Sequence, residues 1–474
     1  MTRFLLSGVA VVSAAVLLVS GCATTPPPEE EKPAERPEEP EETAPEKPRE
    51  QKVEEAYESI SLYMESGEPE KAIAAYEEAR LEDPEDPQTK VLLANLQMAA
   101  GRFSEAESTL DAVLERAPND PEALYLKALL LGARGEGEQQ REALEKAAEQ
   151  PGDQPEAHAA LGELHLEAER YDKAKEAFQT ALDQDEDNFV ALHGLGNVHL
   201  RQEEHEKAEK VLSRAIKARP DYPFTYTDRA EARAAQYQLE KAESDIDQAI
   251  SLAPDYSWNY VDRGRIRFER GDIDKAIRDY SKAIELNPDV FMTYVHRARA
   301  YMAQKEYEKA YRDYSEALER RPDYYWAHAP LGTLSFILGK YSEAARQFRK
   351  ASEHEQKNCS YPLLAGLSWK KTGAPEKAES YLQSVVNAFP RDGLCYNMIR
   401  FYMRPTVDSY NAQQIDDTKD QVLKTKMLFF LAAHYELQGQ ERLAQTYYSR
   451  VQEEKLSRLI VTRLAAHRLK QYRN

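Results

Sequence analysis

The sequence has little of what catalytic loops and disulfide frameworks are built from. Its 474 residues include only 19 glycines and three cysteines. It contains no glycine-rich phosphate-binding loop, no Gly-x-Ser-x-Gly turn and no His-Glu-x-x-His motif. We therefore predict that the protein is not an enzyme and carries no cofactor. An enzymatic function is the less favoured alternative. It would be supported if titratable side chains converged in one pocket.

An excess of positive charge is also absent. The formal net charge is −20 at pH 7, and no basic stripe with interleaved aromatic residues occurs. Because such a chain repels phosphate backbones, we predict no nucleic-acid partner. The acidic stretch Asp183–Asn188 resembles a calcium loop only superficially, because Asn188 replaces the glycine at its sixth position and Gly194 replaces the glutamate at its twelfth. We therefore predict no metal site.

The longest N-terminal hydrophobic run is short for a membrane span. It covers Phe4–Val19, and its 16 residues fall below the roughly 20 that a spanning helix needs. Arg3 precedes the run and small residues follow it, so residues 1–21 have the organisation of a secretion signal. The alternative is a signal anchor that is not cleaved.

The end of this run resembles the cleavage motif of bacterial lipoproteins. Val19, Ser20 and Gly21 precede Cys22, in the order that the motif requires. The resemblance implies that Cys22 carries the lipid and becomes the N-terminus. In that family an aspartate after the cysteine favours the inner membrane, whereas here Ala23 follows. The resemblance thus implies a lipid anchor in the bacterial cell envelope, at an outer membrane facing the periplasm or the cell surface.

Prolines and glutamates dominate the segment that follows the cysteine. Residues 23–52 hold eight prolines and ten glutamates, with almost no apolar residue to bury. Such a segment stays disordered, and proline and like-charge repulsion keep it extended. We predict that residues 22–52 are a lipidated cysteine followed by a semi-rigid tether.

From residue 53 to residue 392 the sequence has a period of 34 residues. Prolines recur at this spacing or its multiples, at Pro84, Pro118, Pro220, Pro254, Pro288, Pro322 and Pro390. Alanines keep the same period from Ala72 to Ala378, except at Gln140. A small residue lies twelve positions before each alanine from Ala106 onward, and a large apolar residue four positions after most of the alanines. The period predicts paired amphipathic helices whose stacking builds one continuous core.

These units resemble tetratricopeptide repeats, and Tyr260–Pro288 is a near-ideal copy. The resemblance implies an all-α fold, a right-handed α-solenoid superhelix of about 11 helix-turn-helix units with a C-terminal capping helix. Ten units occupy residues 53–392, and an irregular helix and loop occupy residues 393–424. Residues 425–474 hold an eleventh unit and the basic capping helix, predicted over Lys455–Tyr472. A basic docking helix for an acidic partner or a lipid surface is the alternative for this last segment.

The resemblance also implies a partner-binding groove, because the family turns certain positions of each first helix toward a concave surface. Here those positions carry large apolar residues and arginines, a composition typical of binding hot spots. The set is Phe224, Trp258, Arg265, Phe268, Met292, Arg299, Met302, Trp326 and Phe336. The alternative is that neighbouring segments cover them. Lysines are absent from the position at which some relatives grip a carboxylate, so we expect an extended or helical apolar partner segment.

Charged residues recur with the period as well. Three consecutive units place an arginine beside the small residue and an aspartate 16 positions later. We predict three partly buried structural ion pairs, Arg229–Asp245, Arg263–Asp279 and Arg297–Asp313. A repeated site for an acidic ligand is the less favoured alternative.

Cys359 and Cys395 remain if Cys22 carries lipid. We expect two free, partly buried thiols, and a disulfide in an oxidising compartment is the alternative. Taken together, the sequence predicts a membrane-anchored scaffold that binds a protein partner of the cell envelope in its groove. The alternative function is a ligand-binding accessory lipoprotein that serves a transporter.

Overall fold

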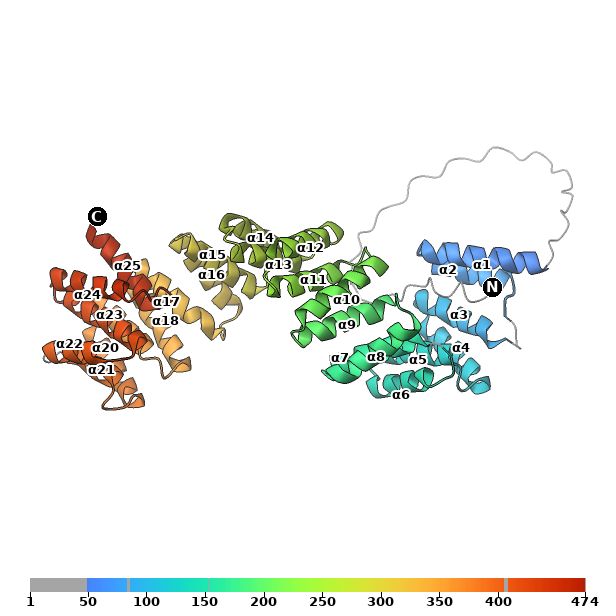
Figure 1. Cartoon of the computed structure of the whole chain (residues 1–474), viewed down its shortest axis with the longest axis horizontal. Helices are drawn as coiled ribbons and strands as arrows, with labels where there is room; N and C mark the ends of the chain where they lie inside the picture. Colours follow the sequence, from blue (N-terminus) through green and yellow to red (C-terminus); the bar gives the residue numbers. More distant parts are fainter. Residues whose placement is uncertain (1–48, 83–85, 153, 405–407, 474) are drawn as a thin grey trace, which may run out of the picture. The chain divides into compact units, whose positions relative to one another are not determined.

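A computed structural model describes residues 49–82, 86–152, 154–404 and 408–473 (Figure 1). The predicted signal, Cys22 and most of the predicted tether lie outside these residues. The described residues form helices and no strands, and they fall into two compact units, with the boundary after Pro220. Successive helices pair as helix-turn-helix hairpins, which confirms the predicted all-α solenoid. Within the described ranges, no helix is both long and apolar enough to cross a membrane.

The first unit contains five helix pairs. Its helices are α1 (Arg49–Glu65), α2 (Pro69–Glu78), α3 (Pro87–Ala99), α4 (Phe103–Arg116), α5 (Pro121–Ala133), α6 (Gly137–Ala148), α7 (Pro155–Glu167), α8 (Tyr171–Gln184), α9 (Phe189–Arg201) and α10 (His205–Ala218). Helix α1 begins at Arg49, so the last four residues of the predicted tether are helical. Proline at the first position of four of these helices costs no hydrogen bond, because the first N–H groups of a helix have no partner in it.

The second unit continues with five pairs and ends in a less regular group of helices. The pairs are α11 (Pro223–Ala235) and α12 (Leu239–Leu252), α13 (Ser257–Glu269) and α14 (Ile273–Leu286), α15 (Phe291–Ala303) and α16 (Tyr307–Arg320), α17 (His328–Ile337) and α18 (Tyr341–His354), and α19 (Ser360–Lys371) and α20 (Pro375–Val385). The final group is α21 (Leu394–Met403), α22 (Asp408–Asp417), α23 (Gln421–Leu437), α24 (Glu441–Glu453) and α25 (Ile460–Arg473). Short 3₁₀ turns, η2 (Tyr325–Ala327) and η3 (Val386–Ala388), precede α17 and follow α20.

Each hairpin turns at a residue in the left-handed backbone region, again with a period of 34. Glycine fills six of the ten positions in the regular pairs, and Glu169, Glu203, Tyr237 and Lys305 fill the others with φ between 55° and 62°. Such a residue ends the first helix and lets the chain reverse within a few residues. The turn therefore fixes the pairing even where the sequence lacks glycine.

Close helix packing depends on the small residues of the first helices. In the first unit the buried ring of Phe178 lies between Gly162 and Gly194. A Cβ atom on Gly194 would come within 2.2 Å of Cζ of Phe178, and one on Gly162 would come within 2.5 Å of its Cε1. The predicted match between a small and a large residue is found for Gly162 and Phe178, and Gly194 of the next first helix, which the pattern did not include, lies on the other side of the ring.

Two predicted boundaries in the last segment are wrong. The sequence predicted an irregular loop through the "DSYNAQQIDDT" stretch, but Asp408–Asp417 forms α22, whose Ile415 is buried. Among the side chains of α22 that the structure describes, only Ile415 is deeply buried, which gives too weak a periodicity to show a helix in the sequence. The last helix begins at Ile460 instead of Lys455.

Candidate partner-binding site

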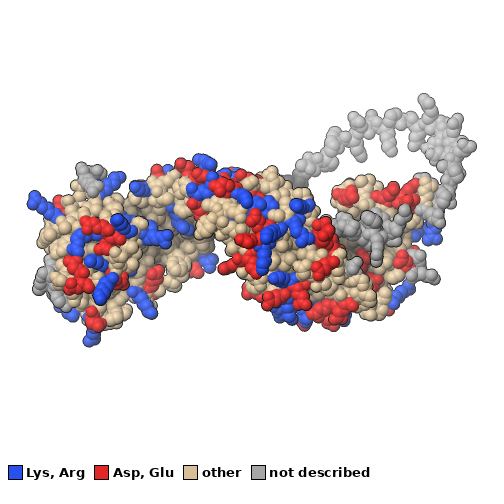
Figure 2. Space-filling model, in the orientation of Figure 1, with Lys and Arg blue, Asp and Glu red and all other residues tan. Residues whose placement is uncertain are grey.

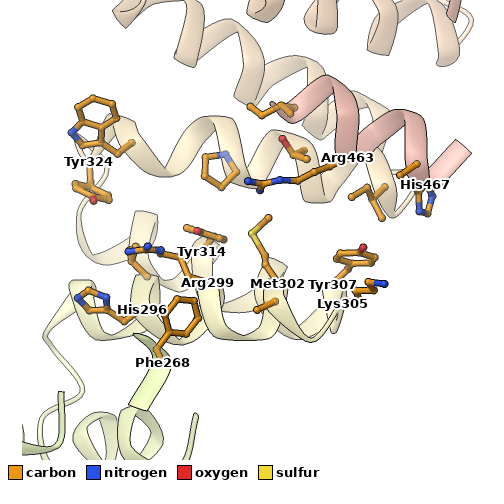
Figure 3. A pocket seen from close by; sticks show the side chains of 18 of the residues that line it. Phe268, His296, Arg299, Met302, Lys305, Tyr307, Tyr314, Tyr324, Arg463 and His467 are labelled. Atoms are coloured by element: carbon orange, nitrogen blue, oxygen red, sulfur yellow. The ribbon is translucent and has the colours of Figure 1, made fainter. Parts of the chain in front are cut away.

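A large cavity lies in the second unit, between first helices of successive pairs and the C-terminal helix (Figure 3). Its volume is about 1300 Å³, and residues of α13, α15, α16, η2, α17 and α25 line it. We call this space the α15–α25 cavity. Helices α13, α15 and α17 are first helices of their pairs, so the cavity lies on the face at which the sequence places the groove.

Five of the nine predicted groove residues line the α15–α25 cavity. They are Phe268, Met292, Arg299, Met302 and Trp326. Trp326 is 57% exposed, and Arg299 lies with its guanidinium 5.8 Å from the ring centre of Phe268. Apolar and aromatic side chains that remain exposed on a concave surface are typical of a binding site.

Three further predicted residues lie outside the cavity. Phe224 and Trp258 are exposed, and Phe224 packs edge to face against Tyr256. Arg265 is exposed and pairs with Asp262 at 3.1 Å. The cavity therefore uses only part of the predicted surface.

The prediction for Phe336 is wrong. Its side chain is only 3% exposed and belongs to the hydrophobic core at the C-terminal end of the chain. It packs against Tyr341, and α25 lies beside both residues. Helix α25 therefore covers a position that the repeat pattern alone leaves open.

Helix α25 is held in this place by a buried charged cluster. Glu436, at the end of α23, accepts hydrogen bonds from Lys371 of α19, Arg468 of α25 and the hydroxyl of Tyr448. The Glu436 side chain is 8% exposed. Burial raises the pKa of Glu436, but Lys371 and Arg468 outweigh it and hold the pKa below its ordinary value. The last helix thus serves as a cap, as predicted, and also forms one wall of the cavity.

The lining of the cavity is cationic although the chain is acidic. Arg299 and Lys305 lie on the α15 side, and Arg463 and Lys470 on α25. The described lining contains no aspartate or glutamate. In the part of the chain that the structure describes, none of these four cations forms an ion pair. The two α25 cations could not be assigned to the site from the sequence, because only the folded chain brings α25 to α15.

Titratable rings in the lining are held neutral. Burial, with Arg265 and Arg299 nearby, lowers the pKa of His296 to about 4. Burial raises the pKa of Tyr314 to about 12, although Arg299 and Arg463 act in the opposite direction. Both arginines therefore face the space around one tyrosine, from opposite walls (Figure 3). At neutral pH the charge of the lining comes from arginine and lysine.

The predicted arginines and aspartates meet between the helices of each pair. Nη2 of Arg229, Arg263 and Arg297 lies 2.6, 2.8 and 2.8 Å from Oδ1 of Asp245, Asp279 and Asp313. The three aspartates are 3 to 5% exposed. These side chains lie outside the cavity lining. Two of the pairs, Arg263–Asp279 and Arg297–Asp313, hold α13 and α15, which line the cavity, to their partner helices.

The rest of this network was not predicted from the sequence. Arg233 and Arg267 give their aspartates a second arginine, at 2.7 Å in both cases. Arg263 also donates a hydrogen bond to Asp247 of the preceding pair. In the next repeat, Arg297 donates to Ser281, which lies 34 residues after Asp247. Arg233 and Arg267 are themselves 34 residues apart, so the period was the signal that could have found them.

The expectation of two free thiols is wrong. Cys359, at the start of α19, and Cys395 of α21 form a disulfide with their Cα atoms 5.8 Å apart. The two cysteines lie in neighbouring repeats, which stacking brings together. A spacing of 36 residues, close to the period, is the feature of the sequence that fits this pairing.

The first unit differs in charge at positions equivalent to those of the cavity. Glu122 and Glu156 occupy the position that Trp258, Met292 and Trp326 hold in the second unit. Burial, with Asp120 and Glu156 nearby, raises the pKa of Glu122 to about 7.

On the face shown in Figure 2, acidic and basic side chains are interspersed over each unit. Among the described residues, no group of three or more histidine, cysteine or acidic side chains could hold a metal ion.

Two family models, both described as tetratricopeptide repeat, match parts of the chain. One matches residues 63–130, and the other matches residues 159–223 and 261–325. The chain contains tetratricopeptide repeats. Such repeats generally mediate protein–protein interactions without catalysing a reaction. No curated protein matches the chain in sequence.

Solved structures of repeat proteins are similar to parts of this chain. YrrB, a TPR protein with an unusual peptide-binding site, is 20% identical over 40% of this chain and 96% of its own, with a TM-score of 0.36. TTC0263, a thermophilic TPR protein of Thermus thermophilus, is 23% identical over 39% of this chain and 100% of its own, with a TM-score of 0.33. Human IFIT1, in a dimer with PPP-AAAA, is 17% identical over 78% of this chain and 91% of its own, with a TM-score of 0.35.

Proposed function

We propose that this protein is a lipid-anchored scaffold of the bacterial cell envelope, and that the α15–α25 cavity binds a segment of a partner protein. The observation that carries the proposal is the cavity itself. It combines the exposed Trp326, half-buried aromatic residues, two methionines and cations that have no ion-pair partner among the described residues. Aromatic residues, methionine and arginine are the residues that protein interfaces enrich.

The lipid anchor rests on different support. The order of Arg3, the apolar run, the small residues and Cys22 matches a lipoprotein signal. The Cys359–Cys395 disulfide fits an oxidising compartment, such as the periplasm or the cell surface. A protein exported by such a signal and held by a lipid on Cys22 would present its cavity within reach of a membrane.

Cell fractionation tests the anchor. We expect the wild-type chain in the outer-membrane fraction and the Cys22→Ser variant in the soluble or unprocessed fraction, because that variant has no thiol to acylate. The Ala23→Asp variant is the matched control and should remain in a membrane fraction but move to the inner membrane. A Cys22→Ser variant that fractionates like the wild type would contradict lipid anchoring.

Crosslinking in the native cell tests the scaffold. We expect the Met292→Ala/Trp326→Ala variant to lose crosslinks to a partner, because both side chains line the cavity. The Tyr237→Ala variant is the control, since Tyr237 is 86% exposed but lies at the α11–α12 turn, outside the lining. An identical set of crosslinked proteins for all three chains would refute the assignment of the binding site.

The size of the cavity supports a second candidate function, the binding of a bulky small molecule. A volume of about 1300 Å³ exceeds the 300–1,000 Å³ of common small-molecule clefts, so a bulky ligand could fill it. In that case the protein would be a ligand-binding accessory to a transporter. Native mass spectrometry of protein purified from its own cells should then reveal a bound small molecule of constant mass.

A further inference from the structure

The shape and charge of the α15–α25 cavity narrow the chemistry of its ligand. Its walls are built from two sides, with Arg299 and Lys305 on one side and Arg463 of α25 on the other (Figure 3). Lys470 of α25 also lines the cavity. We propose that this cavity binds an extended acidic peptide segment with large apolar side chains between its carboxylates, and that α25 supplies half of the cations. This inference rests on the proposed scaffold function.

Charge complementarity is the first argument for this occupant. Four cations face a space whose described lining holds no carboxylate. The chain has a net charge of −20, yet no carboxylate of the described lining neutralises these four cations. A ligand with negative groups would therefore complement the charge of the cavity. Arginine binds carboxylates through two parallel hydrogen bonds, which adds geometric selectivity. A long phosphate backbone fits less well, because the rest of the chain repels it.

The spacing of the cations gives the expected spacing of the acids. Arg463 and Lys470 are seven residues apart, which on an α-helix is nearly two turns and about 10 Å along one face. An extended polyproline II chain has three residues per turn and rises about 3.1 Å per residue, so carboxylates three residues apart lie on one face about 9 Å apart, close to this separation. Two intervening side chains then reach the apolar floor.

The floor explains why acidic residues alone are insufficient. It includes Met292, Met302 and Trp326, which are flexible or amphipathic and adapt to different apolar side chains. Helix α17 has ten residues and is about 15 Å long, which accommodates four or five residues of an extended peptide. The geometry fits a short linear segment, with the acids on the cations and the apolar groups on the floor.

Fluorescence anisotropy with the full-length chain tests this proposal. The probe is a dye-labelled nonapeptide that repeats Glu-Phe-Leu, and we expect saturable binding that weakens as salt rises. Peptides that repeat Lys-Phe-Leu or Glu-Gly-Ser should bind at least about tenfold more weakly, because each lacks one of the two required features. Equal binding of all three peptides, or none by the first, would overturn the proposal.

Matched variants test the site. The Arg299→Gln/Arg463→Gln variant should bind the Glu-Phe-Leu peptide about tenfold more weakly or worse. The Arg312→Gln/Arg458→Gln variant loses the same charge from exposed positions outside the lining and should stay within about twofold of the wild type. Circular dichroism and the unfolding midpoint should show that both variants are folded. Equal losses in both variants would refute the site.

The outcomes separate this inference from the scaffold function. If the arginine variant keeps its crosslinks in cells while Met292→Ala/Trp326→Ala loses them, the scaffold stands and the acidic ligand is refuted. If dodecanoate binds in an arginine-dependent way and the Glu-Phe-Leu peptide does not, the cavity holds a small anionic amphiphile, and the peptide proposal is refuted. Salt-sensitive peptide binding that requires Arg299 and Arg463 supports it.

Discussion

At the scale of single residues, the aspartates of α12, α14 and α16 show how buried charge is tolerated. Each accepts hydrogen bonds from an arginine 16 residues earlier, and Asp245 and Asp279 receive a second arginine from the same helix. A buried ion pair contributes little net stability, because desolvation offsets its attraction. Removing one partner is different, because the remaining charges stay buried without compensation.

Asp279→Ala is therefore expected to destabilise the second unit by about 3–5 kcal/mol. The substitution leaves the partly buried guanidinium groups of Arg263 and Arg267 without their shared carboxylate. Urea unfolding followed by circular dichroism measures the effect. Glu285→Ala removes an exposed partner of Lys282 and should leave the midpoint almost unchanged. Similar midpoints for the two variants would show that the Asp279 cluster is not a structural element.

The same residues show what a sequence can and cannot reveal. The spacing of 16 positions pointed to each arginine and aspartate because both belong to one helix pair. Contacts between pairs were missed, as with Arg263 and Asp247, because they depend on how successive pairs stack. The buried position of Phe336 was missed for a related reason, since the helix that covers it comes from residues more than 120 positions later.

At the scale of elements, α25 decides whether the cavity exists. It supplies Arg463 and Lys470, and it is fixed through Arg468 to Glu436 of α23. The sequence predicted a basic cap with an apolar face, and both features are present. Its contact with α17 and its place opposite α15 could not be predicted, because periodicity describes the face of a helix and not the neighbour that it meets.

We expect Glu436→Gln to loosen α25 while the paired helices stay folded. The substitution removes the charge that Lys371 and Arg468 share. Hydrogen exchange at pH 7 should increase over residues 460–473, whereas the exposed Glu453→Gln variant should exchange like the wild type. Unchanged protection of α25 in Glu436→Gln would mean that apolar packing alone holds the helix.

Acid should have a similar effect on the wild-type chain. The pKa of Glu436 lies below its ordinary value in the folded state, so its contribution to stability is present above the unfolded pKa of about 4.5 and is lost as the pH falls through the folded value. Protection of α25, expressed relative to the intrinsic exchange rate at each pH, should therefore fall on acidification below about pH 4.5 by a larger factor in the wild type than in Glu436→Gln. Equal factors would contradict this role for the carboxylate.

At the scale of the whole molecule, the period of 34 predicted the repeated pairs and left open what the two units do differently. The same helix position carries Glu122 or Glu156 in the first unit and Trp258 or Trp326 in the second. The units therefore share a fold and present different chemistry. The disulfide also distinguishes them, because residues 49–220 contain no cysteine and the second unit contains both bonded cysteines.

Reduction should thus weaken the second unit and leave the first unchanged. The Cys359–Cys395 bond closes a loop of about 36 residues, for which loop-closure entropy gives a stabilisation of about 2–4 kcal/mol. Hydrogen exchange with dithiothreitol should rise in α19 to α24 and stay constant in α1 to α10. The exchange of the Cys359→Ser/Cys395→Ser variant should be the same with and without dithiothreitol, and it should match that of the reduced wild type. If the mass of protein from its native compartment shows two free thiols, the bond does not form there, and the strongest support for an oxidising location is lost.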